Sequence, residues 1–101
     1  MRGGIDFAKV RNLPATMINS RELDDAAAEP KGSLCEDTLF HRLYPGEGSF
    51  DCPAFIKAIE QAGFRGIYGV EVINQAYRML PLKEQAERSF GGAMAQFANL
   101  A

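Results

Sequence analysis

The sequence predicts an α/β fold with parallel strands. The predicted elements follow the order helix, strand, loop, helix, strand, helix. Residues 67–73 are rich in β-branched and aromatic residues without strict alternation, which is typical of a strand covered on both faces. Apolar residues at helical spacing close the chain. Alternating strands and helices favour a parallel sheet with right-handed crossovers, in which ligands gather at the carboxyl ends of the strands.

The first half of the chain has the less regular elements. Residues 5–12 predict a short helix that ends before Pro14, because the residue preceding a proline avoids helical geometry. Residues 16–23 predict a short strand that delivers acidic side chains at its C-terminal end. Residues 26–50 show no sustained period and predict a long loop, which in a compact domain is usually functional or disordered.

A second, better-defined helix follows that loop. Asp51 predicts its N-cap, Pro53 is tolerated in its first turn, and Gly63 marks its end. Apolar residues between these positions form a single stripe at helical spacing. This is the best-defined helix of the chain.

The C-terminal segment, residues 82–100, predicts a long amphipathic helix. Gly91 and Gly92 should each weaken it by about 1 kcal/mol relative to alanine. Two strands are too few for a self-sufficient sheet, since three or more are usually needed. We therefore expect a partner chain or the rest of a larger fold to complete it.

Composition excludes several function classes. A chain of 101 residues with 47% hydrophobic and 24% charged residues fits one small soluble domain. The net charge of −2 gives no basic field for nucleic acid, and no apolar run reaches the roughly 18 residues of a membrane span. No apolar signal core opens the sequence, so we expect a cytoplasmic location and neither nucleic acid nor membrane as a partner.

Cysteine and histidine are scarce. Cys35 and Cys52 are too few for a disulfide scaffold and lack metal-site spacing, so both are interpreted as reduced thiols. The single histidine, His41, excludes a histidine-rich metal site within this chain and is interpreted as a loop residue.

An ordered set of motifs resembles one family. HRLYPGEG, an aspartate-led helix, GFRG and GVEV follow one another between residues 41 and 72. This order resembles the C-terminal part of the sugar phosphate isomerase/epimerase family, within the xylose isomerase-like (β/α)8 barrel superfamily. The resemblance implies that residues 1–101 are a partial TIM barrel, namely its last two βα units plus a preceding helix. It also implies that Met1 begins a truncated or separately expressed portion of a longer barrel.

The resemblance singles out two glutamates. Glu71, in the V-E-V motif, matches a divalent-metal ligand that also transfers the proton beside the substrate carbonyl, and a carboxylate in an apolar run is costly unless paired or metal-bound. Glu22 matches a further metal ligand, with Asp24 and Asp25 as competing carboxylates; Asp24 shares its strand face, whereas Asp25 points the other way or begins the loop. The alternatives are an outward-facing glutamate and an ordinary polar strand end. The implied metal is Mn²⁺ or Mg²⁺, with Zn²⁺ or Co²⁺ as alternatives.

Arg42 matches an arginine that reaches substrate hydroxyls or a metal-bound oxygen, for which a guanidinium supplies a fixed fork of donors. The alternative is a solvated surface arginine. The PGEG segment is interpreted as a turn that shapes the rim of the pocket and positions Arg42. A phosphate cradle made by its amides is the weaker alternative.

The expected function is a metal-dependent sugar or sugar-phosphate isomerase or epimerase that abstracts a proton next to a carbonyl. The nearest alternative is a polyol or hydroxy-acid dehydratase on the same barrel. A third hypothesis is a non-catalytic fragment that self-associates, because unpaired strand edges and uncovered helix stripes favour association. By itself the chain is expected to be inactive, with a sugar or sugar phosphate as the ligand of the completed barrel.

Overall fold

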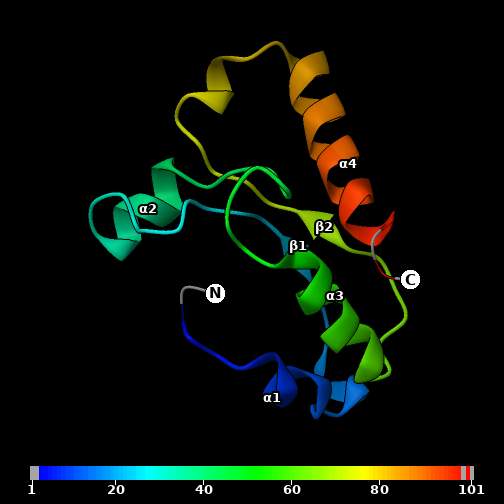
Figure 1. Ribbon diagram of the computed structural model, residues 1–101. Helices are drawn as coiled ribbons and strands as arrows, with labels where there is room; N and C mark the ends of the chain where they lie inside the picture. Colours follow the sequence, from blue (N-terminus) through cyan, green and yellow to red (C-terminus); the bar gives the residue numbers. More distant parts are fainter. Residues whose placement is uncertain (1–2, 99, 101) are drawn as a thin grey trace.

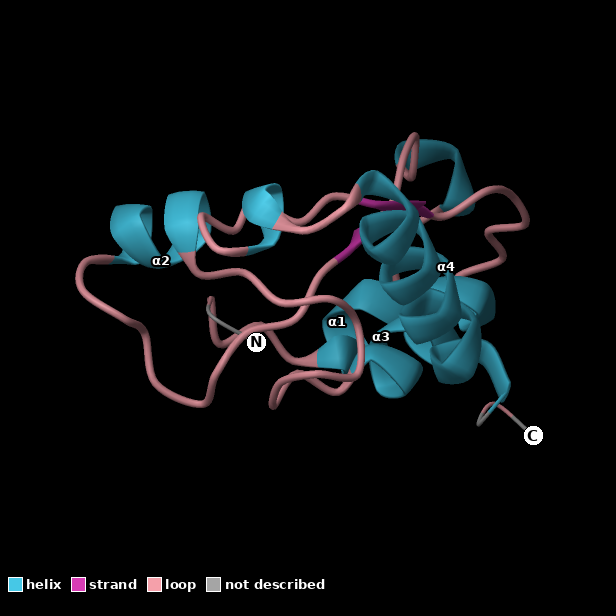
Figure 2. Ribbon diagram, turned by 90° about the horizontal axis from the view of Figure 1, so that it is seen from above, coloured by secondary structure: helices cyan, strands magenta, loops and turns pink. Residues whose placement is uncertain are grey.

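The computed structural model describes residues 3–98 and residue 100 (Figure 1). In chain order the elements are α1 (Phe7–Arg11), η1 (Ala15–Met17), β1 (Glu22–Leu23), α2 (Leu34–Phe40), α3 (Cys52–Gln61), β2 (Gly69–Val70), η2 (Tyr77–Met79) and α4 (Leu82–Ala98). In both ribbon views α2 lies apart from α3 and α4, on the far side of the strands (Figures 1 and 2). The predicted α/β order is confirmed.

The two strands are parallel, and their register places Glu22 opposite Gly69 and Leu23 opposite Val70. Both are much shorter than the predicted runs, and η1 occupies part of the first one. Among the described residues, each strand pairs only with the other. A sheet of two strands is marginally stable, which fits the short length of both strands.

A third segment crosses the carboxyl ends of both strands. Isolated antiparallel bridges join Leu43 to Asp25 and His41 to Asn74. The segment 41–43 therefore lies between the chain that leaves β1 and the chain that leaves β2. This crossing brings the HRLYPGEG motif to the end of the sheet where ligands of parallel folds bind.

The helices at positions 5–12 and 51–63 are confirmed by their caps. The Asp6 carboxylate accepts from the Ala8 amide at 2.8 Å, and the Asp51 carboxylate accepts from the Ala54 amide at 3.0 Å. Gly63, with φ +98°, lies just beyond the end of α3 in a conformation that favours glycine.

The predicted structureless loop 26–50 is wrong in one part, because it contains α2. A capping box begins this helix: Ser33 Oγ accepts from the Glu36 amide at 3.1 Å, and Glu36 Oε2 accepts from the Ser33 amide at 2.8 Å. The helix has seven residues and only Asp37 is buried, so it leaves no apolar stripe in the sequence.

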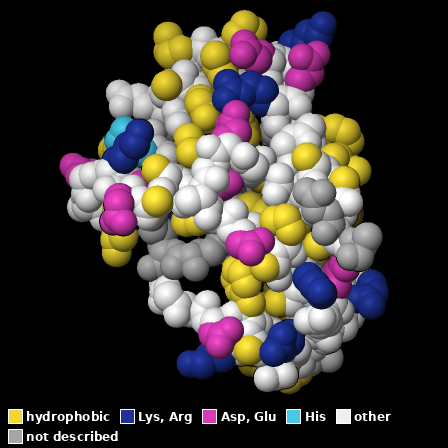
Figure 3. Space-filling view, viewed as in Figure 1, with side chains coloured by type: hydrophobic (Ala, Val, Ile, Leu, Met, Phe, Trp, Pro, Cys, Tyr) yellow, Lys and Arg dark blue, Asp and Glu magenta, His cyan; other side chains and the backbone are white. Residues whose placement is uncertain are grey.

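The core contains side chains of α3, of β1 and of the loops that follow β1. Its buried side chains include Leu23, Ala26, Ile56 and Ile59. In contrast, α4 forms as predicted but has no buried residue among those described. Hydrophobic side chains are therefore left at the surface around α4 (Figure 3). Within the described part of the chain, no helix has the length and apolar character needed to cross a membrane.

Candidate active site at the carboxyl ends of the strands

Three acidic side chains lie on the face of the strands opposite to Leu23 and Val70, whose side chains face α4. Glu22 and Asp24 flank Leu23, whose side chain is buried, so both acids take the opposite face. Glu71 follows Gly69 by two residues and therefore shares their face. Gly69, directly opposite Glu22, presents no side chain there. The alternation of side chains thus places three carboxylates on one face of the strands.

Glu22 and Glu71 meet across the sheet. A side-chain hydrogen bond between the two carboxyl groups, and then the negative charge of Glu71, raise the pKa of Glu22 above its ordinary value. A nearby negative charge disfavours ionisation of a carboxyl group, and a bound cation relieves that repulsion. The pair therefore has the chemistry of a shared proton site or a cation site.

Arg42 contacts Asp24, the third acid on this face. Its Nε is 3.4 Å from Asp24 Oδ2, its Nη2 donates to Thr38 Oγ1 at 3.1 Å, and its guanidinium carbon lies 5.4 Å from the centre of the Phe50 ring. The Arg42 side chain is only 13% exposed, which rules out the solvated surface arginine. Its buried Nε makes no hydrogen bond within the described part of the chain, although it stands within ion-pair range of Asp24.

Several charges set the protonation of Asp24. Burial raises its pKa above the ordinary value, and although the Arg42 guanidinium lowers it, the negative charges of Asp25, Glu71 and Asp37 raise it further. Asp24 is therefore coupled to both the arginine and the glutamate that the motifs singled out. The sequence predicted Asp24 only as a carboxylate that competes with Glu22 as a metal ligand.

The backbone of Arg42 is held by the chain that follows β2. The Arg42 amide donates to the Ile73 carbonyl at 3.2 Å, and Asn74 Nδ2 donates to the Arg42 carbonyl at 2.9 Å. Asn74 is 7% exposed and also accepts from the Ala76 and Tyr77 amides, at 2.8 and 3.0 Å. The buried asparagine thus ties the arginine segment to the start of η2.

The PGEG turn is organised by a carboxylate that the sequence did not single out. Asp25 is completely buried. Its Oδ1 accepts from the amides of Ala26 and Phe50, both at 2.8 Å, and its Oδ2 accepts from the amides of Gly46 and Gly48, both at 3.0 Å. These amides are already occupied, so the turn is structural and the phosphate-cradle alternative is wrong.

A second cluster fixes the same turn to α4. Glu47 accepts from Arg88 Nη2 at 2.5 Å and from Tyr77 Oη at 2.9 Å, and the rings of Tyr44 and Tyr77 stack with centroids 4.8 Å apart. Burial alone would raise the pKa of Glu47, but the hydrogen bonds from Arg88 and Tyr77 outweigh it and hold that pKa below its ordinary value. The cluster links η2 and α4 to the PGEG turn.

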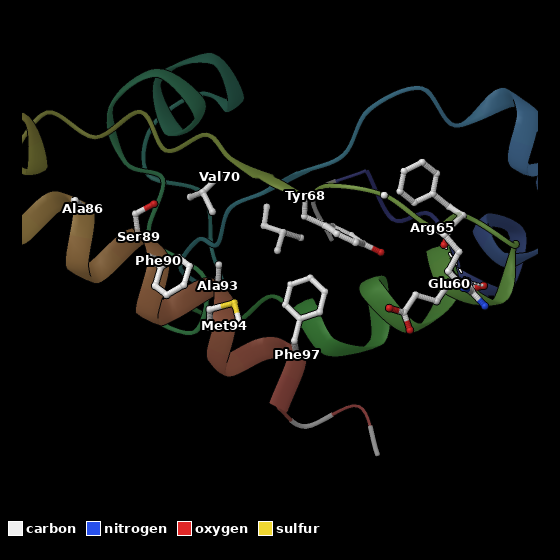
Figure 4. A pocket seen from close by; sticks show the side chains of 13 residues that line it. Glu60, Arg65, Tyr68, Val70, Ala86, Ser89, Phe90, Ala93, Met94 and Phe97 are labelled. Carbon is white, nitrogen blue, oxygen red and sulfur yellow. Dashed lines mark hydrogen bonds between the residues drawn. The ribbon is translucent and has the colours of Figure 1, made fainter.

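The described part of the chain has two hollows of similar volume, about 550 and 540 Å³, and Glu22 and Gly69 line the second. A cavity of about 550 Å³ lies on the other face of the strands, where Phe90, Met94 and Phe97 of α4 face Tyr68 and Val70 (Figure 4). Its lining is mostly apolar, and Glu22, Asp24 and Glu71 are not part of it. We therefore place the candidate site at the acidic face and not in this cavity.

The acidic side chains supply only part of the ligand set of a divalent metal. Among residues 3–98 and 100, no group of three or more histidine, cysteine, aspartate or glutamate side chains is arranged to hold a metal ion. Glu22 and Glu71 offer oxygen donors that meet, which suits a hard divalent cation, but such ions take about six ligands. The two glutamates fit part of a metal site.

Comparison with known proteins gives relatives with two activities. No protein-family model matches the sequence. The 3-dehydroshikimate dehydratases of Pseudomonas aeruginosa and Pseudomonas putida are 36% identical over 77 residues and 28% identical over 81 residues. The inosose isomerase of Bacillus subtilis is 26% identical over 81 residues. These matches cover 76 to 80% of this chain but only 12%, 13% and 28% of the respective relatives.

Solved structures give the fold. A xylose isomerase-like TIM barrel/4-hydroxyphenylpyruvate dioxygenase fusion protein superposes with a TM-score of 0.88, over 99% of this chain and 16% of its own. The IOLI protein, solved with a bound zinc atom, superposes with a TM-score of 0.83 over 97% of this chain and 34% of its own. Both are 22% identical to the chain, so the likeness concerns the fold.

Proposed function

We propose that this chain, which is homologous to 3-dehydroshikimate dehydratases and inosose isomerases and has the fold of part of a xylose isomerase-like TIM barrel, forms one wall of a metal-dependent active site. The observation that carries the proposal is the meeting of Glu22 and Glu71 at the carboxyl ends of two parallel strands, next to the Asp24 carboxylate that pairs with Arg42. Residues 1–101 would be the last two βα units of such a barrel plus a preceding helix. The other walls would come from the remaining barrel or from a second chain.

The proposed reaction is the isomerisation or epimerisation of a sugar or sugar phosphate, by removal of a proton next to a carbonyl. A divalent metal would polarise that carbonyl when bound. Glu22 and Glu71 would hold the metal, and Glu71 would also take the proton, since a carboxylate within hydrogen-bond reach of that position can act as general base. Mn²⁺ and Mg²⁺ suit oxygen donors, and the zinc in the IOLI structure makes Zn²⁺ a further ion to test.

Arg42 would bind substrate oxygens. Its guanidinium is held by Asp24, yet its buried Nε is left without a hydrogen bond among the described residues. A buried donor of this kind is costly unless an acceptor reaches it, and a substrate hydroxyl is a suitable acceptor. This supports the role of a substrate clamp.

Dehydration of a hydroxy acid is the second candidate reaction. The relative with the highest identity among those compared, at 36%, is a 3-dehydroshikimate dehydratase. Such a reaction also begins with proton removal next to a carbonyl, so Glu71 and Arg42 would keep the same roles. The two reactions differ in whether a hydroxyl group then leaves.

A chimaera tests the proposal. This chain would replace the matching segment of the Bacillus subtilis inosose isomerase, with which it shares 26% identity. We expect a folded chimaera to turn over inosose or 3-dehydroshikimate in the presence of Mn²⁺, Mg²⁺ or Zn²⁺, and Glu71→Gln to abolish that turnover while circular dichroism stays unchanged. The matched control is Glu60→Gln on α3, away from the acidic face, which should keep turnover. Full turnover by the Glu71→Gln chimaera would refute the assignment.

A further inference from the structure

We propose that Asp25 is a positioning residue: its buried carboxylate fixes the loop 44–50 and, through that loop and its own backbone, the guanidinium of Arg42. The effect on turnover rests on the proposed function, whereas the effect on Arg42 does not. The proposal starts from a carboxylate that is completely buried yet fully supplied with donors.

The four donors are all backbone amides. Each Asp25 oxygen accepts two of them, at 2.8 to 3.0 Å. Hydrogen bonds to an ionised carboxylate are about twice as strong as neutral ones, and burial without them would be prohibitive. Because three of the amides belong to Gly46, Gly48 and Phe50, one side chain determines the path of the whole turn.

Asp25 is also linked to Arg42 from three directions. Its backbone exchanges hydrogen bonds with Leu43, the neighbour of Arg42, at 2.9 and 2.8 Å. Its Oδ1 holds the amide of Phe50, whose ring lies below the guanidinium. Its chain neighbour Asp24 is the ion-pair partner of Arg42. The link through Phe50 depends on the carboxylate, so removal of the carboxylate would loosen the ring that lies below the guanidinium.

The turn is shaped for this carboxylate. A β-carbon at Gly48 would collide with the Ala26 carbonyl oxygen and with Asp25 Oδ1, so only glycine lets the turn close on the acid. Gly46 has φ +91°, a conformation that side chains rarely adopt. An asparagine at position 25 would present an amide group to amide donors, so it keeps the shape of the side chain while breaking half of its hydrogen bonds.

Nuclear magnetic resonance on the whole chain tests the proposal in three measurements. In the unaltered chain, the amides of Gly46, Gly48 and Phe50 should exchange slowly with solvent. In Asp25→Asn or Asp25→Ala, their exchange should accelerate about tenfold for each hydrogen bond lost, and the Arg42 Nε–Hε signal should move to the position of a free arginine. In Asp25→Ala, added formate should occupy the position of the missing carboxylate. It should slow the exchange of the three amides again and return the Arg42 signal to its original position.

Asp51→Ala is the matched control, because it removes one carboxylate–amide bond at the end of the same loop without touching Asp25. It should leave the Arg42 signal in place. The proposal is overturned if the three amides exchange freely in the unaltered chain, or if Arg42 keeps its signal in a folded Asp25 variant. Unfolding of both Asp25 variants, with Asp51→Ala folded, would assign Asp25 to stability alone and also overturn it. None of these readouts needs turnover, so they separate this proposal from the proposed function.

Discussion

Glu22 and Glu71 come together across the two parallel strands, where hydrogen bonding with Glu71 and then its negative charge raise the pKa of Glu22. The pairing of Glu22 with Gly69 explains the contact, because the glycine opposite leaves room for the glutamate side chains on that face. A small domain does not gather like charges without cost, since two adjacent carboxylates resist ionisation. The arrangement is understandable if a cation and a substrate complete the site.

Adjacent glycines in α4 should respond oppositely to alanine. At Gly91 a β-carbon would meet nothing within 4 Å, so Gly91→Ala should stabilise the chain by about 1 kcal/mol through helix propensity. At Gly92 a β-carbon would lie 2.6 Å from the Pro45 carbonyl oxygen, so Gly92→Ala should destabilise it by about 1 to 3 kcal/mol. Urea denaturation of the two variants measures both changes. Equal effects would show that α4 does not pack on the PGEG turn.

The Glu47 cluster should make stability depend on pH in acid. The folded-state pKa of Glu47 lies below its ordinary value of 4.5, so the stabilisation is complete above pH 4.5 and is lost as the pH falls through the folded-state pKa. Glu47→Gln should cost about 1 kcal/mol at neutral pH and much less in strong acid. Denaturation of both chains between neutral and acidic pH tests this. A constant difference at every pH would contradict it.

The two thiols should differ in reactivity. Burial, and then the charges of Asp25, Asp24 and Asp51, raise the pKa of Cys52 to about 11, whereas Cys35 is exposed. At neutral pH Cys52 should hold about 100-fold less thiolate than an unperturbed thiol. A disulfide reagent should therefore label Cys35 quickly and Cys52 only on unfolding.

Cys35→Ser is the control for this labelling and should remove the fast phase. Rapid labelling of the Cys35→Ser chain in its folded state would show that α3 does not bury Cys52.

Local signals predicted α1, α3 and α4 from the sequence. Caps such as Asp51 and stripes of helical period act over a few residues, so a single sequence reveals them. The same kind of signal could have found α2, because Ser33 and Glu36 form a capping box. Helical periodicity does not predict α2, because the helix is short and lacks an apolar stripe.

Long-range contacts could not be predicted from the sequence. The motifs singled out Glu22, Arg42 and Glu71, but the pairing of Arg42 with Asp24 depends on a segment that returns across both strand ends. The buried Asp25 looked like one of two acids in a row, and only the fold shows that its amide partners lie in PGEG. The one hint in the sequence is that Asp25 directly follows Asp24, so its side chain points to the opposite face of the strand.

The most direct test of the candidate site is paramagnetic broadening by Mn²⁺ on this chain, because broadening detects even weak binding. We expect affinity no tighter than about millimolar, since the chain supplies only some of the ligands that a divalent ion needs. Signals of Glu22, Asp24 and Glu71 should broaden first, and Glu71→Gln should abolish their selective loss. Tight stoichiometric binding, or first broadening at residues away from the acidic face, would contradict the account.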